Sequence, residues 1–102
     1  MERIIDSIRQ IKDNIFRIDD MRPGSLSQQM RKAKEKYGSY WQLSYTYRGK
    51  GKTEYVRNAF VKQVRLETHN FKRYRKLSDQ LVQLSIDLSR LKMEVAKKEE
   101  SE

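Results

Sequence analysis

The sequence predicts a mainly α-helical α+β fold with one antiparallel β-hairpin. Three patterns indicate this fold: isoleucines at helical spacing over residues 1–20, strict alternation on both sides of a glycine-rich turn within 39–57, and leucines at heptad spacing over 74–95. The first helix leads toward the hairpin and the last leads away from it. The N-terminal helix is therefore expected to pack antiparallel on a long, coiled-coil-like C-terminal helix.

A chain of 102 residues is expected to form a single domain, 1–102. It divides by pattern into a helical arm (1–20), a basic segment with the hairpin (21–57), a long helix (58–98) and a frayed tail (99–102). Only 36% of the residues are hydrophobic, so a homodimer that completes the core is expected. No apolar run approaches the length of a signal sequence core or a membrane span, which predicts a cytoplasmic protein, or one in the host cytoplasm if it is viral, with no membrane contact.

Positive charge is concentrated in the middle of the chain. Residues 21–76 hold fifteen basic residues against three acidic ones, whereas residues 1–20 and 77–102 each carry a small net negative charge. The whole chain has a formal net charge of +9 and a pI near 9.9. Such a concentration favours a polyanionic partner, most simply nucleic acid.

The N-terminal arm has isoleucines at alternating steps of four and three residues, which predicts a helix of about five turns over residues 1–20. These isoleucines are Ile4, Ile8, Ile11, Ile15 and Ile18. Pro23 and Gly24 are expected to end this helix.

A second, short helix is expected to begin at Ser25, because Ser25 and Gln28 have the spacing of a capping box, and to end at Gly38. Its apolar stripe would consist of Leu26, Met30, Ala33 and Tyr37. Its exposed side would be basic and consist of Arg31, Lys32, Lys34 and Lys36.

The hairpin is predicted from the alternation over residues 39–57. A turn centred on Lys50 and Gly51 would place Arg48 opposite Thr53. The alternation sorts the side chains onto two faces whatever the turn type. The face expected to pack on a helix or a second ribbon consists of Trp41, Leu43, Tyr45, Tyr47 and Val56. The open, polar face consists of Gln42, Ser44, Thr46, Arg48, Thr53, Tyr55 and Arg57.

One long helix is expected from about Asn58 onward, because the rest of the chain contains no proline or glycine. Its leucine seam suits packing on the first helix, and a thinner second stripe of Val82, Ile86 and Met93 suits a four-helix dimer. The residues predicted to pack in the helix pair or the dimer are Ile4, Ile8, Ile11, Ile15, Leu77, Leu81, Leu84, Val82, Ile86, Leu88, Leu91 and Met93.

Several of these segments resemble an uncharacterised family of short bacterial and archaeal proteins found beside, or fused to, transposases. The resemblance extends over most of residues 21–92. It rests on a G-S-L-S start (Gly24–Ser27), a G-P-Y-Y-like entry to the ribbon (Gly38–Trp41), a G-K turn followed by a T-x-Y-V strand (Gly49–Val56), and a leucine-rich C-terminal helix that begins near Tyr74. The resemblance implies an association with mobile-element DNA and no established activity.

The sequence departs from this family in two places. Many members have a short cysteine-rich segment before the ribbon, whereas this chain has RKAKEKY at 31–37 and no cysteine at all. The position of the family's proline before the ribbon is held by Ser39. Without cysteine the chain also lacks disulfides, thiolate nucleophiles and cysteine-based zinc sites.

No combination of residues indicates an active site. His69 is the only histidine, and in a basic helix it is expected to be a surface residue or a phosphate contact. The run Gly49–Lys52 lacks the spacing and the following helix start of a P-loop. The chain is therefore predicted not to be an enzyme and to use no metal, cofactor or small-molecule substrate.

The favoured function is binding of nucleic acid, with DNA favoured, by a small basic dimer associated with mobile-element or viral DNA. The alternative is a non-enzymatic adaptor whose helical arms dock a protein partner from a mobile element. DNA and RNA are not distinguished by the sequence. The residues predicted to contact nucleic acid are Gln42, Thr46, Arg48, Lys50, Lys52, Thr53, Tyr55, Arg57, Lys62, Arg65, Lys72, Arg73 and Lys76.

Overall fold

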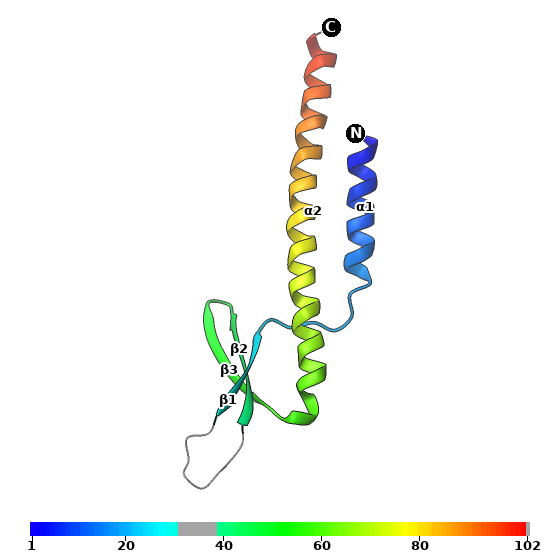
Figure 1. The fold of residues 1–102 in the computed structure, drawn as a ribbon. Helices are drawn as coiled ribbons and strands as arrows, with labels where there is room; N and C mark the ends of the chain where they lie inside the picture. The colour runs from blue at the N-terminus through cyan, green and yellow to red at the C-terminus, as the bar shows by residue number, and fades with distance from the viewer. Residues whose placement is uncertain (31–38, 102) are drawn as a thin grey trace. The chain divides into compact units, whose positions relative to one another are not determined.

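The chain folds as two helices and a three-stranded antiparallel sheet, as the computed structural model in Figure 1 shows for residues 1–30 and 39–101. The elements are α1 (Glu2–Phe16), β1 (Ser25–Met30), β2 (Ser39–Tyr47), β3 (Lys50–Val56), a short 3-10 helix η1 (Asn58–Phe60) and α2 (Val61–Ser101). The mainly helical α+β class predicted from the sequence is confirmed.

These elements form two compact units. Unit 1 consists of residues 1–18 and 73–102, and unit 2 of residues 19–72, so the long helix α2 contributes to both. Each unit has its own packing.

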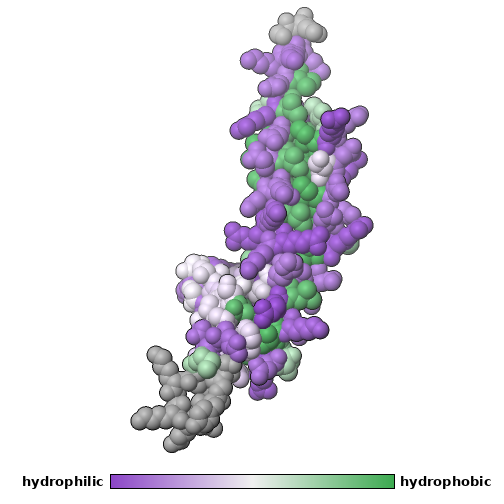
Figure 2. Space-filling view, viewed as in Figure 1, coloured by the Kyte–Doolittle hydropathy of each residue, from purple (hydrophilic) through white to green (hydrophobic). Residues whose placement is uncertain are grey.

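Unit 1 is an antiparallel pair of helices, as predicted (Figure 1). Ile8 is buried at 8% exposure, and the isoleucines and leucines of the two seams are half-buried, whereas Val95 at the end of the second seam is exposed. Apolar surface runs along the pair in Figure 2. Helix α1 is shorter than predicted: it ends at Phe16, and Ile18 lies beyond it, with its N–H donating to the Ile15 carbonyl over 3.1 Å. At the other end of the chain, α2 is helical through Ser101, past the predicted end at residue 98.

Unit 2 is a sheet packed on the first turns of α2, with the strand order β1-β2-β3. Its core consists of Leu43, which has no exposed surface, with Val56 and Val64. Burying a side chain such as Leu43 stabilises the fold by roughly 2–3 kcal/mol. Leu26, Trp41, Tyr45 and Val61 pack around this core. The hairpin face of Trp41, Leu43, Tyr45 and Val56 therefore packs on a helix, as predicted, whereas Tyr47, predicted for the same face, is 50% exposed.

The short helix predicted from Ser25 is wrong, because residues 25–30 form the edge strand β1. Leu26 pairs with Leu43 and joins the core, whereas Ser25 and Ser27 point to the other face. Pairing with β2 is what brings Leu26 to the core. The other residues predicted for this helix, 31–38 with their basic side chains, lie outside the described residues.

The approach to β1 requires glycine at position 24. Gly24 has φ +140°, and a Cβ atom there would lie 2.5 Å from Leu43 Cδ1. The preceding segment is tied to α2 because the Arg22 N–H donates to the Glu67 carbonyl (3.1 Å) and Asn70 Nδ2 donates to the Asp20 carbonyl (2.9 Å). These contacts place β1 beside β2, where a capping box alone would predict a helix.

The predicted hairpin register is also wrong, although the predicted faces are correct. Tyr47 pairs with Lys50, so the turn consists of Arg48 and Gly49 rather than being centred on Lys50 and Gly51. Thr53 pairs with Ser44 and not with Arg48. The turn lies two residues earlier than predicted, so the partner of each residue changes by four positions. This even shift leaves the strand side chains on their predicted faces, whereas Arg48, predicted on the polar face, lies in the turn.

Candidate nucleic-acid interface

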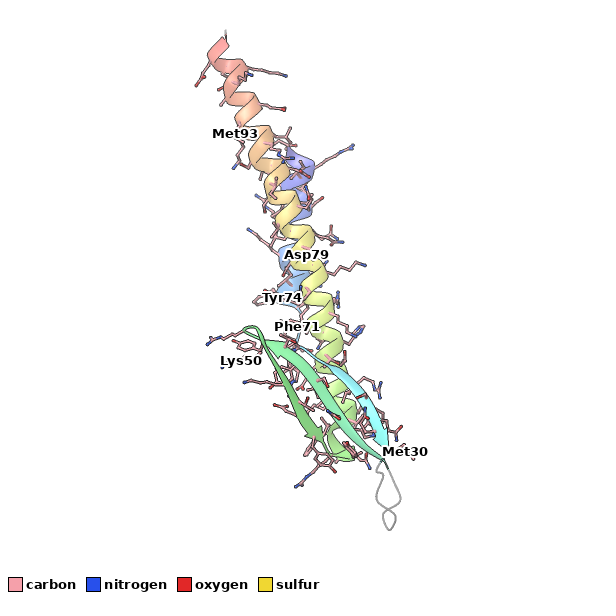
Figure 3. The ribbon with its side chains drawn as sticks, turned by 90° about the vertical axis from the view of Figure 1, so that its left-hand side faces the viewer. Met30, Lys50, Phe71, Tyr74, Asp79 and Met93 are labelled. Atoms are coloured by element: carbon pink, nitrogen blue, oxygen red, sulfur yellow. The ribbon has the colours of Figure 1, made fainter. Side chains whose placement is uncertain are left out.

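The end of the hairpin is a two-stranded ribbon. The last residue pair between β1 and β2 is Ser25 with Ser44. Residues 45–52, which comprise the ends of β2 and β3 and the turn between them, therefore extend beyond β1, and their only strand pairing is between β2 and β3. We call residues 45–52 the hairpin tip. Lys50 marks this end of the sheet in Figure 3, and Met30 marks the opposite end. The tip carries four of the predicted contact residues, all exposed: Thr46, Arg48, Lys50 and Lys52.

The turn at the hairpin tip has positive φ at both central residues, +52° at Arg48 and +77° at Gly49. Turns of this type match the right-handed twist of the flanking strands, and they favour glycine at the second position. The Arg48 guanidinium lies 5.2 Å from the centre of the Tyr47 ring, which holds it beside the ribbon. The turn therefore presents a charged, bidentate donor at the end of a narrow ribbon.

The sheet has one face turned away from α2, which we call the outer face. Gln42, Thr46, Thr53 and Tyr55 lie on it, as predicted from the alternation, and Tyr55 is 62% exposed. Arg57 follows β3 in an extended conformation and is exposed. The predicted base-contacting side chains thus share one accessible side of unit 2.

The start of α2 supplies a second set of basic side chains in unit 2. Arg65, His69 and Lys72 recur at helical spacing and line an open hollow of about 300 Å³ beside the start of β1. The Arg65 guanidinium lies 5.4 Å from the centre of the Trp41 ring, which orients it. Lys62 is exposed one turn earlier on the same helix. His69 therefore lies among phosphate-binding residue types, consistent with the surface position predicted for it.

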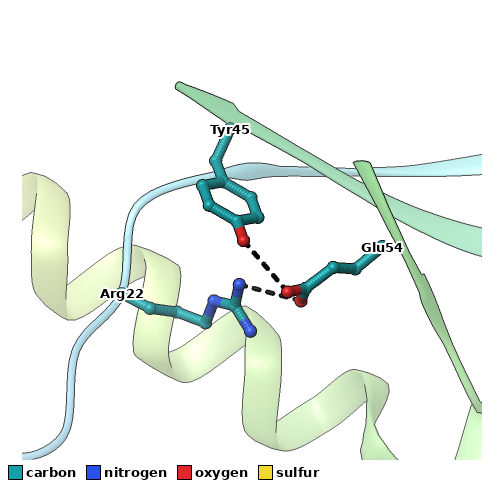
Figure 4. Close-up of polar contacts among 3 residues, drawn as sticks. All are labelled: Arg22, Tyr45 and Glu54. Carbon is teal, nitrogen blue, oxygen red and sulfur yellow. Dashed lines mark hydrogen bonds and ion pairs between the residues drawn. The ribbon is translucent and has the colours of Figure 1, made fainter. Parts of the chain in front are cut away.

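Glu54 is the one acidic side chain on β3, and it is engaged by neighbours in unit 2 (Figure 4). Arg22 forms an ion pair with it at 2.9 Å, and the Tyr45 hydroxyl donates to it at 3.0 Å. The hydrogen bond from Tyr45 and the adjacent Arg22 hold the pKa of Glu54 below its ordinary value. The same hydrogen bond raises the pKa of Tyr45.

The Arg22 guanidinium also lies 5.0 Å from the centre of the Tyr45 ring, so Arg22 is clamped between the ring and the carboxylate. Its Nε atom is buried without a hydrogen-bond partner among the described residues. Arg22 acts here as an internal counterion for Glu54. The carboxylate of Glu54 is thereby neutralised beside the hairpin tip.

The other basic side chains of the region have no such partner. Between Arg48 and Lys72, the described part of the chain pairs no lysine or arginine with a carboxylate within 4 Å. Glu67 instead accepts a hydrogen bond from Gln63 Nε2 at 3.3 Å. The positive charge carried by the basic side chains between Arg48 and Lys72 is therefore available to an external anion.

Eleven of the thirteen predicted contact residues belong to unit 2, and Arg73 and Lys76 belong to unit 1. The sequence prediction missed Ser25, Ser27, Gln29 and Tyr40, which extend the polar outer face onto β1 and the start of β2. The alternation of Ser25 and Ser27 with Leu26 was the available signal. The capping-box spacing of Ser25 and Gln28 favoured a helix instead.

Among the described residues, no helix has the length and apolar content that a membrane crossing requires.

The comparisons with known proteins identify a family, but no individual curated protein or solved structure matches the chain. A family defined as a domain of unknown function, DUF6788, matches residues 1–66, which span α1, the whole sheet and the first turns of α2. This agrees with the resemblance to an uncharacterised family, although the matched range begins earlier and ends earlier than residues 21–92. Because the match covers more than half of the 102 residues, the chain belongs to the DUF6788 family.

Proposed function

We propose that this protein is a non-enzymatic nucleic-acid-binding protein that binds duplex DNA through the hairpin tip and the basic start of α2. The observation that carries the proposal is the hairpin tip itself. It is a two-stranded ribbon with Arg48, Lys50 and Lys52 exposed, and the nearby Glu54 is neutralised by Arg22.

The shape of the hairpin tip favours the major groove of B-DNA, which is about 12 Å wide and admits a two-stranded ribbon. Arg48 would contact base edges, with guanine as its best bidentate partner, and Thr46 would contact them from the same ribbon. Lys50 and Lys52 would contact phosphates, together with Lys62 and Arg65 of α2. The major groove of A-form RNA is too deep and narrow for a ribbon, which supports DNA over RNA.

The helical pair of unit 1 would join two copies, so that a dimer presents two hairpin tips to DNA. Val82, Ile86 and Met93 are 58%, 41% and 63% exposed, which makes them available for such an interface. The link to mobile-element DNA rests on the sequence resemblance alone.

Fluorescence anisotropy with a mixed-sequence DNA duplex, from about 50 to 300 mM salt, tests this function. Wild-type affinity should fall steeply with salt, with a slope of about −0.9 for each phosphate contacted. K50E/K52E should weaken binding at least tenfold at about 100 mM salt and reduce the slope by roughly two units.

The matched control is K12E/K97E, which makes the same charge change at two exposed lysines of unit 1. It should retain most of the wild-type affinity. If wild type fails to bind at the lowest salt, or if the two double variants weaken binding equally, the hairpin tip is not a DNA-binding element.

The second candidate function is a protein-interaction adaptor that acts through unit 1. The exposed apolar side chains of α2 favour it, because they line an open groove of about 520 Å³ together with Leu81. Under this alternative, V82S/I86S would abolish partner capture while K50E/K52E would leave it unchanged.

A further inference from the structure

The outer face of the three-stranded part of the sheet is chemically unlike the rest of unit 2. Its side chains lie in cross-strand rows, Ser25–Ser44–Thr53 and Ser27–Gln42–Tyr55, followed by Gln29–Tyr40. Within the described strands, none of these side chains carries a charge. Unit 2 places α2 on the opposite face, and the outer face is the one turned to the viewer in Figure 3.

Two tyrosines lie together on this face. The rings of Tyr40 and Tyr55 are 6.3 Å apart between centres and tilted by 39°. Tyr55 is 62% exposed, whereas Trp41 and Tyr45 of the same sheet are half-buried against the core and beneath arginines. Tyr40 supports one side of the Tyr55 ring and leaves much of that ring accessible. An exposed, supported aromatic ring is the element on which unpaired bases stack.

Amide and hydroxyl groups surround the tyrosine pair. Gln29 Nε2 donates to Ser27 Oγ at 3.0 Å, which orients the Gln29 amide on the outer face. Gln42 lies between Ser27 and Tyr55 in the same cross-strand row. Side-chain amides both donate and accept hydrogen bonds, as the edges of bases require.

The outer face itself carries no charge, because Lys50, Lys52 and Glu54 of β3 lie on the opposite face, but a cation lies at each end of β3. Arg48 is in the turn that precedes β3, and Arg57 directly follows the strand. The nine residues of β2 span roughly 30 Å at about 3.4 Å each, which is long enough for several nucleotides. A strand lying along β3 could place its phosphates near these cations and its bases on the tyrosine pair.

From this arrangement we infer that the outer face binds single-stranded nucleic acid, with Tyr55 stacking on an unpaired base. A duplex keeps the faces of its bases stacked on one another, so it cannot use this site without opening. The inference rests on the proposed function and deepens it: the hairpin tip binds the duplex and the outer face binds a strand released from it.

Anisotropy with labelled oligothymidine of about fifteen nucleotides, an abasic strand of the same length and a mixed-sequence duplex tests the inference. Y55A should weaken oligothymidine binding by roughly 5- to 100-fold, the effect of losing one stacked base, and should weaken duplex binding far less. Y55F keeps the ring and should bind like wild type. Neither variant should alter binding of the abasic strand, which has phosphates but no bases.

The control F16A removes an aromatic ring that is 86% exposed in unit 1, and it should leave oligothymidine binding unchanged. Circular dichroism of each variant checks that the sheet is retained. If the duplex binds and oligothymidine does not, or if Y55A and F16A act alike, the single-strand site is overturned while the proposed function stands. If neither nucleic acid binds at about 50 mM salt, the proposed function fails and the inference fails with it.

Discussion

Glu54 shows how a single residue adjusts the charge of a basic surface. Its position on β3, opposite Leu43, turns it toward Arg22 and Tyr45 on the side of the sheet that faces α2. Within residues 21–76 of the sequence, Glu54 is one of three acidic residues and Arg22 is one of fifteen basic residues, so the sequence alone does not indicate that they pair. Their pairing joins positions 32 residues apart, and only the packed sheet places them together.

Replacing Glu54 with Gln should destabilise the protein in a pH-dependent way. The pKa of Glu54 is lowered in the folded state, so its ionised form stabilises the fold above the ordinary glutamate pKa of about 4.3, and this contribution is lost as the pH falls through the lowered value. Because the Glu54 side chain is 45% exposed, E54Q should lower the free energy of unfolding by only about 0.5–1 kcal/mol at pH 7.

Urea unfolding from pH 7 down to about pH 3 measures this effect. The difference between wild type and E54Q should shrink toward the acidic end. The control E94Q removes an exposed carboxylate of unit 1 and should show no such trend. A difference that is constant with pH would mean that the pair with Arg22 does not form in solution.

At the scale of elements, the alternation in the hairpin correctly predicted which strand side chains share a face. The position of the turn was predicted wrongly, because two residue–glycine pairs lie next to each other in the sequence. The run RGKGK offers Arg48-Gly49 and Lys50-Gly51, and both choices give the same two faces. Burial of the apolar side chains determines which residues share a face, but not which residues form the turn. The choice between two even registers depends on where Val56 must lie to reach Leu43 and Val64.

The two glycines of this run should respond differently to substitution. Gly49 has φ +77° with open space around a Cβ atom, so G49A should cost about 1–2 kcal/mol through backbone strain alone. Gly51 is in β3 without a positive φ and is also unobstructed, so G51A should be nearly neutral. A turn centred on Lys50 and Gly51 would reverse this order.

Thermal unfolding of the two variants measures the difference. G49A should lower the Tm by roughly 4–8 °C for each kcal/mol of stability lost. Asparagine tolerates positive φ better than alanine, so G49N should recover part of the loss.

At the scale of the whole molecule, the described residues form very little core. Only Ile8, Leu43, Val56 and Val64 are buried hydrophobic side chains, and Ile8 is the one that belongs to unit 1. An open groove of about 460 Å³ lies between the two helices of unit 1 beside Ile8. A helix pair packed this loosely gains little stability alone, so a second copy is expected to cover its remaining apolar residues.

Sedimentation equilibrium should therefore detect a dimer of the 12.3 kDa chain. V82S/I86S should shift it toward monomer, because both side chains lie on the exposed stripe of α2. The control L66S alters a residue of unit 2 that is 60% exposed and should leave the dimer intact. A wild-type monomer at about 100 μM would rule out this interface.

The sequence by itself determined the helices of unit 1, the two faces of the hairpin and the location of the positive charge. Each depends on a local pattern: heptad spacing, alternation, and composition along the chain. Only the tertiary structure decided that residues 25–30 form a strand, that Arg22 neutralises Glu54, and that Tyr40 supports Tyr55. Each of these depends on residues far apart in the chain packing together around the sheet, and the spacing of neighbouring residues does not show which distant residues will meet.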